Sequence, residues 1–203
     1  PSYTVQVDRT AFAEKFESAI LQLDKKTPHQ EAKLREAEEQ LKRFLHLHLR
    51  GPAGSGKTYV GVDLLLKDMK ANPTHDVLIA AQNVALLFFI VKWMCRRLPV
   101  HLRSRWLRRI AAFHAPFKEL RGFVLRKGIL YSSPWSGSRR FDLYFVDEAH
   151  HVFADSVARS AIERLLSDNP TAKHIFLSDI SQSLGDEMPH FTGDMREVCL
   201  TEV

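Results

Sequence analysis

The 203-residue chain contains only two cysteines, Cys95 and Cys199, which is too few for a disulfide framework. That composition is typical of a reducing compartment, so we expect an intracellular protein, either cytoplasmic or nuclear. The chain also has no apolar run as long as a membrane span, since the longest, at 84–91, is ended by Lys92. It has no signal peptide and begins with Pro1 rather than methionine. We therefore expect a piece of a longer protein that has no membrane partner.

Acidic residues are scarce in one part of the chain. Between positions 77 and 141 there are thirteen Lys or Arg residues and one acid, Glu119, so this segment carries +12 and the remainder carries −7. Such an asymmetry indicates contact with nucleic acid, or a solvated basic face that has no ligand. Trp106 lies among four arginines at 103–109, where it would either stack on bases or pack inward from an amphipathic helix. We favour inward packing.

One stretch, GPAGSGKT at 51–58, organises the rest of the chain. It follows the apolar alternation of Leu45, Leu47 and Leu49 and precedes a helix predicted over 58–70. A strand, a glycine-rich loop and a helix in this order are the context of a phosphate-binding P-loop. The glycines let the backbone approach a phosphate, and the N–H groups of the loop point at its negative charge. Lys57 would supply a cation for the phosphates, and Thr58 would supply a hydroxyl group for Mg²⁺.

We therefore predict that the chain binds ATP together with Mg²⁺. The residues predicted to contact the nucleotide are Gly51, Pro52, Ala53, Gly54, Ser55, Gly56, Lys57, Thr58 and Tyr59.

A second candidate motif is FDLYFVDEAHH at 141–151. Its apolar residues at 143–146 predict a buried strand that ends in Asp147 and Glu148. In P-loop NTPases an acid in this position holds Mg²⁺, and the next carboxylate can orient and deprotonate the attacking water. We predict that Asp147 is a metal ligand together with Thr58, and that Glu148 and Lys57 are catalytic. Four histidines, His46, His48, His150 and His151, lack a metal-ligand pattern supported by cysteines or by a HExxH helix.

Periodicity and turn signals predict the remaining elements. Strands are expected at 3–7, 77–81, 175–177 and from 197 onward, with one or two more around 111–113 and 123–131. Helices are expected at 12–23, 34–44, 83–97 and 100–110, and from an N-cap at Asp155 through 166, while 132–140 is expected to be a loop. Short apolar strands that alternate with helices predict an α/β fold in which helices cover both faces of a parallel sheet.

The order of these pieces resembles the first RecA-like lobe of superfamily 1 helicases and related P-loop ATPases. GPAGSGKT looks like motif I, VLIAAQNVA at 77–85 like the nucleic-acid-touching motif Ia, and VDEAHH at 146–151 like motif II. SDISQ at 178–182 looks like motif III, with Ser178 in place of the family's glycine. That likeness implies that Gln182 senses the γ-phosphate. TPHQEA at 27–32 is similar to the family's Q motif, which implies that Gln30 reads the adenine.

The resemblance implies a single RecA-like ATPase lobe at 29–203, preceded by an appendage or linker at 1–28. Its implied partners are single-stranded DNA or RNA and a second RecA-like lobe, which carries the arginine that completes the ATP site. The chain alone would then hydrolyse ATP weakly. An alternative is a signalling NTPase that nucleotide switches between conformations and that never translocates on nucleic acid. The residues do not separate the Schlafen-like branch from the other branches of the superfamily.

Overall fold

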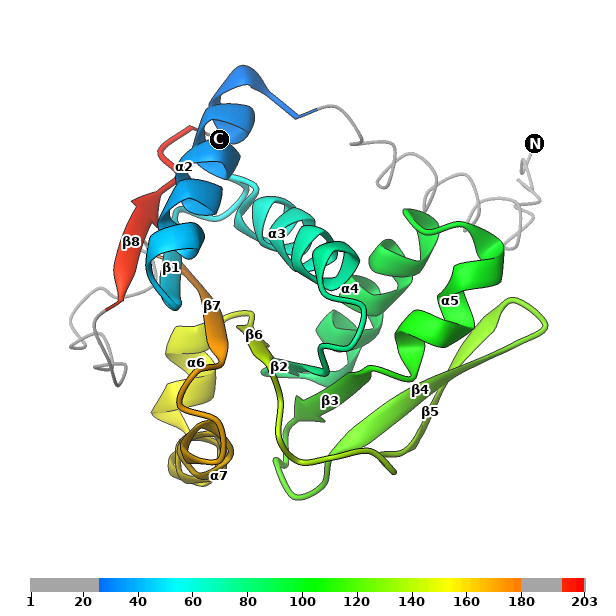
Figure 1. Cartoon of the computed structure of the whole chain (residues 1–203). Coiled ribbons are helices and arrows are strands. Elements are labelled where there is room, and N and C mark those ends of the chain that lie inside the picture. Colours follow the sequence, from blue (N-terminus) through cyan, green and yellow to red (C-terminus); the bar gives the residue numbers. More distant parts are fainter. Residues whose placement is uncertain (1–25, 180–194, 203) are drawn as a thin grey trace, which may run out of the picture.

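The computed structural model describes residues 26–179 and 195–202, so the predicted strand at 3–7 and helix at 12–23 lie outside the described residues. One eight-stranded sheet runs through it in the order β5-β4-β3-β2-β6-β7-β1-β8 (Figure 1). The strands are β1 (His46–Gly51), β2 (Val77–Ala81), β3 (Ile110–His114), β4 (Arg121–Arg126), β5 (Ile129–Pro134), β6 (Leu143–Val146), β7 (Lys173–Asp179) and β8 (Arg196–Cys199). The helices are α2 (Pro28–Arg43), α3 (Lys57–Ala71), α4 (Val84–Arg96), α5 (Val100–Leu107), α6 (Ala149–Ala154) and α7 (Ser156–Ser167).

The strands from β3 to β8 in the sheet order pair in parallel, as the sequence predicts. Their carboxyl ends therefore meet at one edge of the sheet, where α/β folds bind their ligands. Strands β2 and β6 have the predicted bounds, and every residue in them is buried. Strand β7 lies between β1 and β6, so the strand before the glycine-rich loop and the strand before Asp147 are not neighbours.

A hairpin of β4 and β5 adds an antiparallel edge to the parallel sheet. Its two-residue turn consists of Lys127 and Gly128, whose φ angles are 50° and 79°. Positive φ at both central residues matches the right-handed twist of the paired strands. Strand β5 continues to Pro134, so the first residues of the loop predicted at 132–140 belong to the sheet instead.

Helices cover both faces of the sheet, as predicted (Figure 1). On one face, α2, α3 and α4 pack on a cluster that includes Leu47, Ile79 and Phe145. On the other face, α6 and α7 pack on a cluster that includes Tyr144 and Phe176. Alternate residues of β2, β3, β6 and β7 therefore supply the two cores, which is the pattern of a sheet buried between helical layers.

Capping side chains set the ends of several helices. Asp155 accepts hydrogen bonds from the N–H groups of Val157 and Ala158 and begins α7, as predicted. Asn83 does the same for α4 by accepting from Leu86. The short helix α6, which begins after Glu148, is not predicted by periodicity because it spans less than two turns. Within the described ranges, no helix combines the length and apolarity that a membrane crossing requires.

Candidate active site

The glycine-rich loop connects β1 to α3 at the carboxyl edge of the sheet. Gly54 and Gly56 have φ angles of 82° and 87°, a region that side chains with a Cβ rarely adopt. A Cβ on Gly56 would also lie 2.4 Å from Nε2 of Gln30. The loop therefore requires glycine here, and left-handed residues of this kind occur in the backbone turns that bind anions. Pro52 is half-buried, Ala53 is exposed, and Ser55 is buried within the loop.

Lys57 is held inside this loop. Its ammonium group donates hydrogen bonds to the carbonyl oxygens of Gly51 and Pro52, both at 2.8 Å, and its side chain is buried. A buried ammonium group needs such acceptors, because desolvating an unpaired charge costs several kcal/mol. The bonds fix the cation of Lys57 against the loop that the sequence predicts as the phosphate site.

Thr58 and Asp147 meet although 89 positions separate them in the chain. The Thr58 hydroxyl donates to Oδ2 of Asp147 at 2.9 Å, and Oδ1 of Asp147 accepts the backbone N–H of Glu148, also at 2.9 Å. Burial raises the pKa of Asp147 to about 6. The structure thus brings the two predicted metal ligands together at the carboxyl ends of β1 and β6. An oxygen pair of this kind is the donor set that Mg²⁺ prefers.

Glu148 lies next to Asp147 with its backbone in the left-handed region, at φ 52° and ψ 46°. That conformation begins α6 and turns the carboxylate toward His150, whose Nε2 lies 3.5 Å from Oε2 of Glu148. Glu148 Oε2 is inaccessible to solvent, and it accepts no hydrogen bond from any described residue. A left-handed backbone conformation is uncommon for residues other than glycine, and such strained residues are often found at functional sites.

Gln30 lies beside the glycine-rich loop, but its amide also has a structural task. Thr27 and Gln30 form a capping box at the start of α2, in which each side chain bonds the backbone N–H of the other. The same amide group reaches Gly56, as the close approach of its Nε2 shows. His29, one residue earlier, accepts the backbone N–H of Thr201 after β8. The Gln30 side chain is therefore fixed within reach of the predicted nucleotide site.

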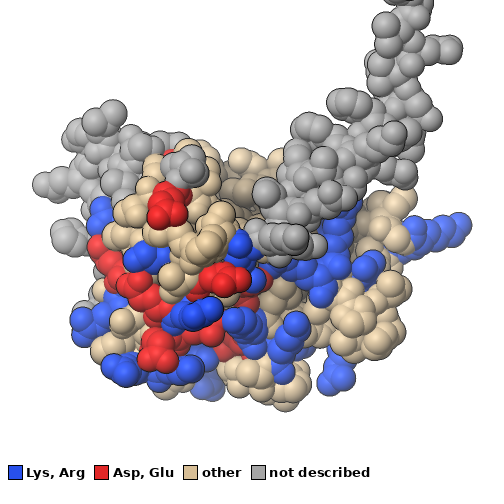
Figure 2. All heavy atoms as spheres, turned by 90° about the horizontal axis from the view of Figure 1, so that it is seen from above, with Lys and Arg blue, Asp and Glu red and all other residues tan. Residues whose placement is uncertain are grey.

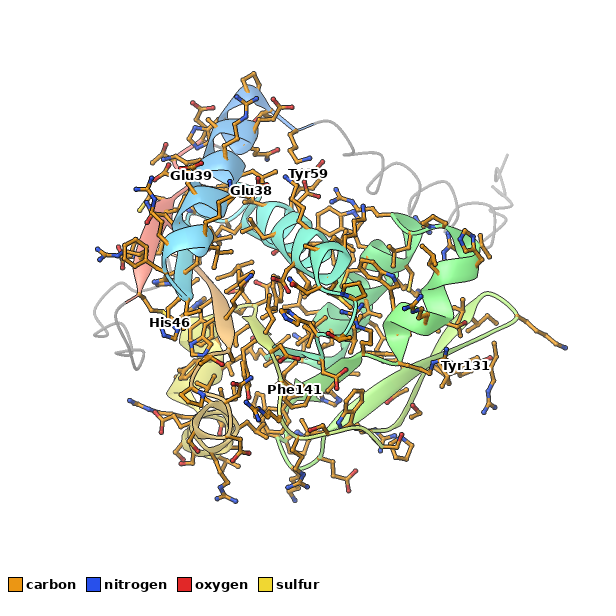
Figure 3. The ribbon with its side chains drawn as sticks, in the orientation of Figure 1. Glu38, Glu39, His46, Tyr59, Tyr131 and Phe141 are labelled. Carbon is orange, nitrogen blue, oxygen red and sulfur yellow. The ribbon has the colours of Figure 1, made fainter. Side chains whose placement is uncertain are left out.

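The Tyr59 side chain contacts the neighbouring helix α4. It projects from α3 (Figure 3), is buried, and packs against Trp93 with ring centroids 5.2 Å apart. The guanidinium group of Arg97 covers the ring at 4.6 Å from its centroid and also pairs with Asp63. This environment is a packed contact between α3 and α4 with a cation–π component.

Gln182 and most of the segment that resembles motif III lie outside the described residues. The first two residues of that segment, Ser178 and Asp179, are described and buried at the carboxyl end of β7. Ser178 Oγ lies 2.5 Å from Nε2 of His48 on the adjacent strand β1. Burial lowers the pKa of His48 to about 4. His48 is thus a buried, hydrogen-bonded core residue.

One side of the molecule carries basic residues without acidic ones. Seen from above, Lys and Arg occur without acids on the side where Figure 1 places α5 and the hairpin (Figure 2). Trp106 is 7% exposed and packs inward, as favoured from the sequence. Arg109 has a structural role, because its guanidinium group donates to the carbonyl oxygens of Asn72 and His75. Arg105 and Arg108 are exposed on α5 and at its end.

Sequence reasoning missed two features of the site. The first is the capping box at Thr27 and Gln30, although the Thr-x-x-Gln spacing was a signal for it. The second is the closeness of Glu148, His150 and His151, each of which places one ligand-type atom within 4.8 Å of the others. No standard spacing announces this cluster, because the left-handed turn at Glu148 creates it.

No protein-family model matches the chain, and no curated protein matches it either. Among solved structures, the chain is similar to the large terminase of a thermophilic bacteriophage, with a TM-score of 0.49 and 14% identity over 86% of this chain and 45% of that one. It is also similar to the large terminase ATPase domain of a Thermus phage, with a TM-score of 0.48 and 14% identity over 97% and 86% of the two chains. The Pif1 helicase of Candida albicans gives 0.45 and 12% over 88% and 40%. The chain thus spans less than half of the first of these terminases and of the Pif1 helicase. The sheet order and the loop geometry of this chain show its α/β fold without these similarities.

Proposed function

We propose that the chain binds an Mg²⁺–nucleoside triphosphate, with ATP as the nucleotide, and that it supplies the residues for hydrolysis. The single observation that carries this proposal is the 2.9 Å hydrogen bond between Thr58 and Asp147. It joins the end of the glycine-rich loop to the acid after β6, which are the two places that hold the metal in P-loop NTPases. A glycine-rich connector without a nucleotide would not need a buried carboxylate beside it.

The residues present fit such a nucleotide. The backbone of 51–56 would cradle the phosphates, and Lys57 would exchange its carbonyl partners for phosphate oxygens. Thr58 and Asp147 would hold Mg²⁺, which when bound neutralises charge on the phosphate oxygens. Gln30 is proposed to contact the adenine from the start of α2, and Gln182 to sense the γ-phosphate. Tyr59, which packs on Trp93, is proposed to support the site through the position of α3.

Glu148 is proposed as the general base. Its carboxylate follows Asp147 directly, so this side chain would reach a water bound beside the metal. General-base assistance contributes about 10²–10⁴ to a rate. The left-handed backbone and the contact with His150 orient the carboxylate before any substrate binds.

We further propose that the chain is a motor lobe of the superfamily 1 type, which acts on single-stranded nucleic acid together with a second RecA-like lobe. The support is the basic side of the molecule (Figure 2). Lys92, Arg96 and Arg103 line a cavity of about 260 Å³ between α4, α5 and the hairpin turn. Arg126 and Lys127 are exposed at that turn. Cations along a groove that also has apolar walls suit a single strand, because they meet phosphates while bases contact the walls.

Nucleotide binding is tested by titrating a fluorescent ATP analogue with Mg²⁺ present. We expect Lys57→Ala to abolish tight binding, and Lys70→Ala, at the exposed end of the same helix, to leave it unchanged. Equal affinities for the two folded variants would refute the phosphate site.

Nucleic-acid binding is tested separately by fluorescence anisotropy with a labelled single strand. The variant Arg105→Ala/Arg108→Ala/Arg126→Ala removes three exposed cations from the basic side. Its matched control, Arg35→Ala/Lys42→Ala/Arg43→Ala, removes three from α2. We expect only the first variant to weaken binding and to lower the slope of log affinity against log salt, by about 0.7 for each lost phosphate contact. Equal binding by both, with nucleotide binding intact, would favour the signalling NTPase.

A further inference from the structure

Three side chains of metal-ligand type gather in the residues that follow β6 and Asp147. Glu148, His150 and His151 each place one oxygen or nitrogen atom within 4.8 Å of the others. The rings of His150 and His151 lie side by side, with centroids 4.1 Å apart. This cluster has a different chemistry from the Thr58–Asp147 pair, since two of its three donors are imidazoles.

The separation of the first two donors matches a coordination sphere. In a tetrahedral zinc site with bonds of about 2.1 Å, neighbouring ligand atoms lie roughly 3.4 Å apart. Glu148 Oε2 and His150 Nε2 are 3.5 Å apart, so both can reach one ion with little movement. The inaccessible Oε2, which accepts no hydrogen bond from a described residue, would gain a partner that compensates for its burial.

The third donor, His151, leaves the site open to a metal ion from the solvent. His150 is buried, whereas His151 is exposed and stands on the first turn of α6. Its ring already lies beside that of His150, so one of its nitrogen atoms is within 4.8 Å of the other two donors. A water molecule would complete the fourth position, as in other sites that have three protein ligands.

We propose that Glu148, His150 and His151 bind a transition-metal dication of the Zn²⁺ class, at a site separate from the Mg²⁺ site of Thr58 and Asp147. Imidazole donors select Zn²⁺, Cu²⁺ or Ni²⁺, whereas Mg²⁺ takes oxygen ligands and rarely binds imidazole. The bound ion is coordinated by the Glu148 carboxylate, which then cannot accept a proton. If Glu148 is the base of the proposed hydrolysis, as that function requires, Zn²⁺ inhibits turnover without displacing the nucleotide.

The test measures the metal directly, so it does not depend on hydrolysis. Metal-stripped chain is titrated with Zn²⁺ by calorimetry in millimolar Mg²⁺, with wild type compared to His151→Ala, Glu148→Gln and the control His101→Ala. His101 is an exposed histidine on α5, remote from the cluster. We expect a site that Mg²⁺ does not block, with affinity lowered about tenfold or more in His151→Ala and Glu148→Gln and unchanged in His101→Ala.

Three outcomes overturn the site: no Zn²⁺ binding by the wild type, equal affinity in His151→Ala and wild type, or displacement by Mg²⁺. Both ligand variants change partly or fully exposed side chains, and circular dichroism checks that they fold. A second measurement separates the site from its consequence: the fluorescent ATP analogue is titrated with and without Zn²⁺. Zn²⁺ binding with unchanged nucleotide affinity supports the proposal even if the chain proves to hydrolyse nothing. In that case the proposed hydrolysis fails, whereas the metal site stands.

Discussion

Replacing Asp147 with asparagine is expected to stabilise the chain while it destroys the proposed metal site. Asp147 is only 2% exposed, and burial raises its pKa from an ordinary value of 3.8 to about 6. The folded state therefore holds this proton up to about pH 6, whereas the unfolded state releases it near pH 4. Above pH 6 the ionised carboxylate destabilises the fold, and the cost fades as the pH falls from 6 to 4. A difference of about two pKa units corresponds to about 3 kcal/mol, which we take as an upper value.

Asparagine keeps the shape and the acceptor for the Glu148 N–H, and its amide can donate to the Thr58 hydroxyl. The assay is urea unfolding of both proteins without Mg²⁺, at about pH 7.5 and about pH 4. We expect Asp147→Asn to be the more stable protein at the higher pH and to lose that advantage at the lower one. The matched control is Asp155→Asn at the exposed N-cap of α7, where asparagine caps equally well, so it makes the same change of side chain at a site that is not buried. A gain that is absent, or equal at both pH values, would refute the reasoning.

Three further changes test other parts of the structure. Glu148→Gln should retain nucleotide binding and reduce single-turnover phosphate release by about 10²–10⁴, because the amide is not basic; release within a few-fold of wild type would exclude Glu148 as the base. Gly56→Ala should lower the unfolding free energy by roughly 1–3 kcal/mol, from its φ of 87° and the contact with Gln30, and thermal unfolding checks this. His48 and His174 should destabilise the fold on acidification, opposite to the contribution of Asp147, because burial lowers the pKa of His48 to about 4 and of His174 to about 3. Unfolded histidine takes up its proton near pH 6.5, so stability falls from there downward, and His48→Gln should flatten the profile.

The elements that the sequence predicts best are those in which local signals agree. Strands β2 and β6 are continuous apolar runs between turns, and their predicted bounds match the structure. The loop at 51–58 is predicted by its glycines, because its backbone adopts positive φ angles at Gly54 and Gly56. By contrast, the hairpin turn at Lys127 and Gly128 gives only a weak signal, and its pairing sets where β5 ends. The first residue of the loop predicted at 132–140 could therefore not be predicted from local sequence, because pairing with β4 determines it.

The basic segment shows a second limit of sequence reasoning. Its charge is evident from composition, but the task of each arginine is not. Arg109 bonds to carbonyl groups around the end of α3, and Arg97 covers Tyr59, whereas Arg105 and Arg108 remain exposed. Spacing along the helix cannot separate these roles, because the partners come from segments that are distant in the chain. A surface for nucleic acid is therefore smaller than the count of cations suggests.

The meeting of Thr58 and Asp147 depends on a residue that gives no signal in the sequence. Strand β7 separates β1 from β6, so α3 must lie close over the sheet for Thr58 to reach Asp147. Gly61, one turn after Thr58, permits this approach: a Cβ there would lie 2.9 Å from Cε2 of Phe145 on β6 and 3.1 Å from Cδ2 of Leu177 on β7. Glycine inside a helix costs up to about 1 kcal/mol relative to alanine, and propensity alone would treat it as a defect. Here the missing side chain sets the height of α3 above the sheet. That height determines whether the hydroxyl of Thr58 and the carboxylate of Asp147 can bind the same metal ion.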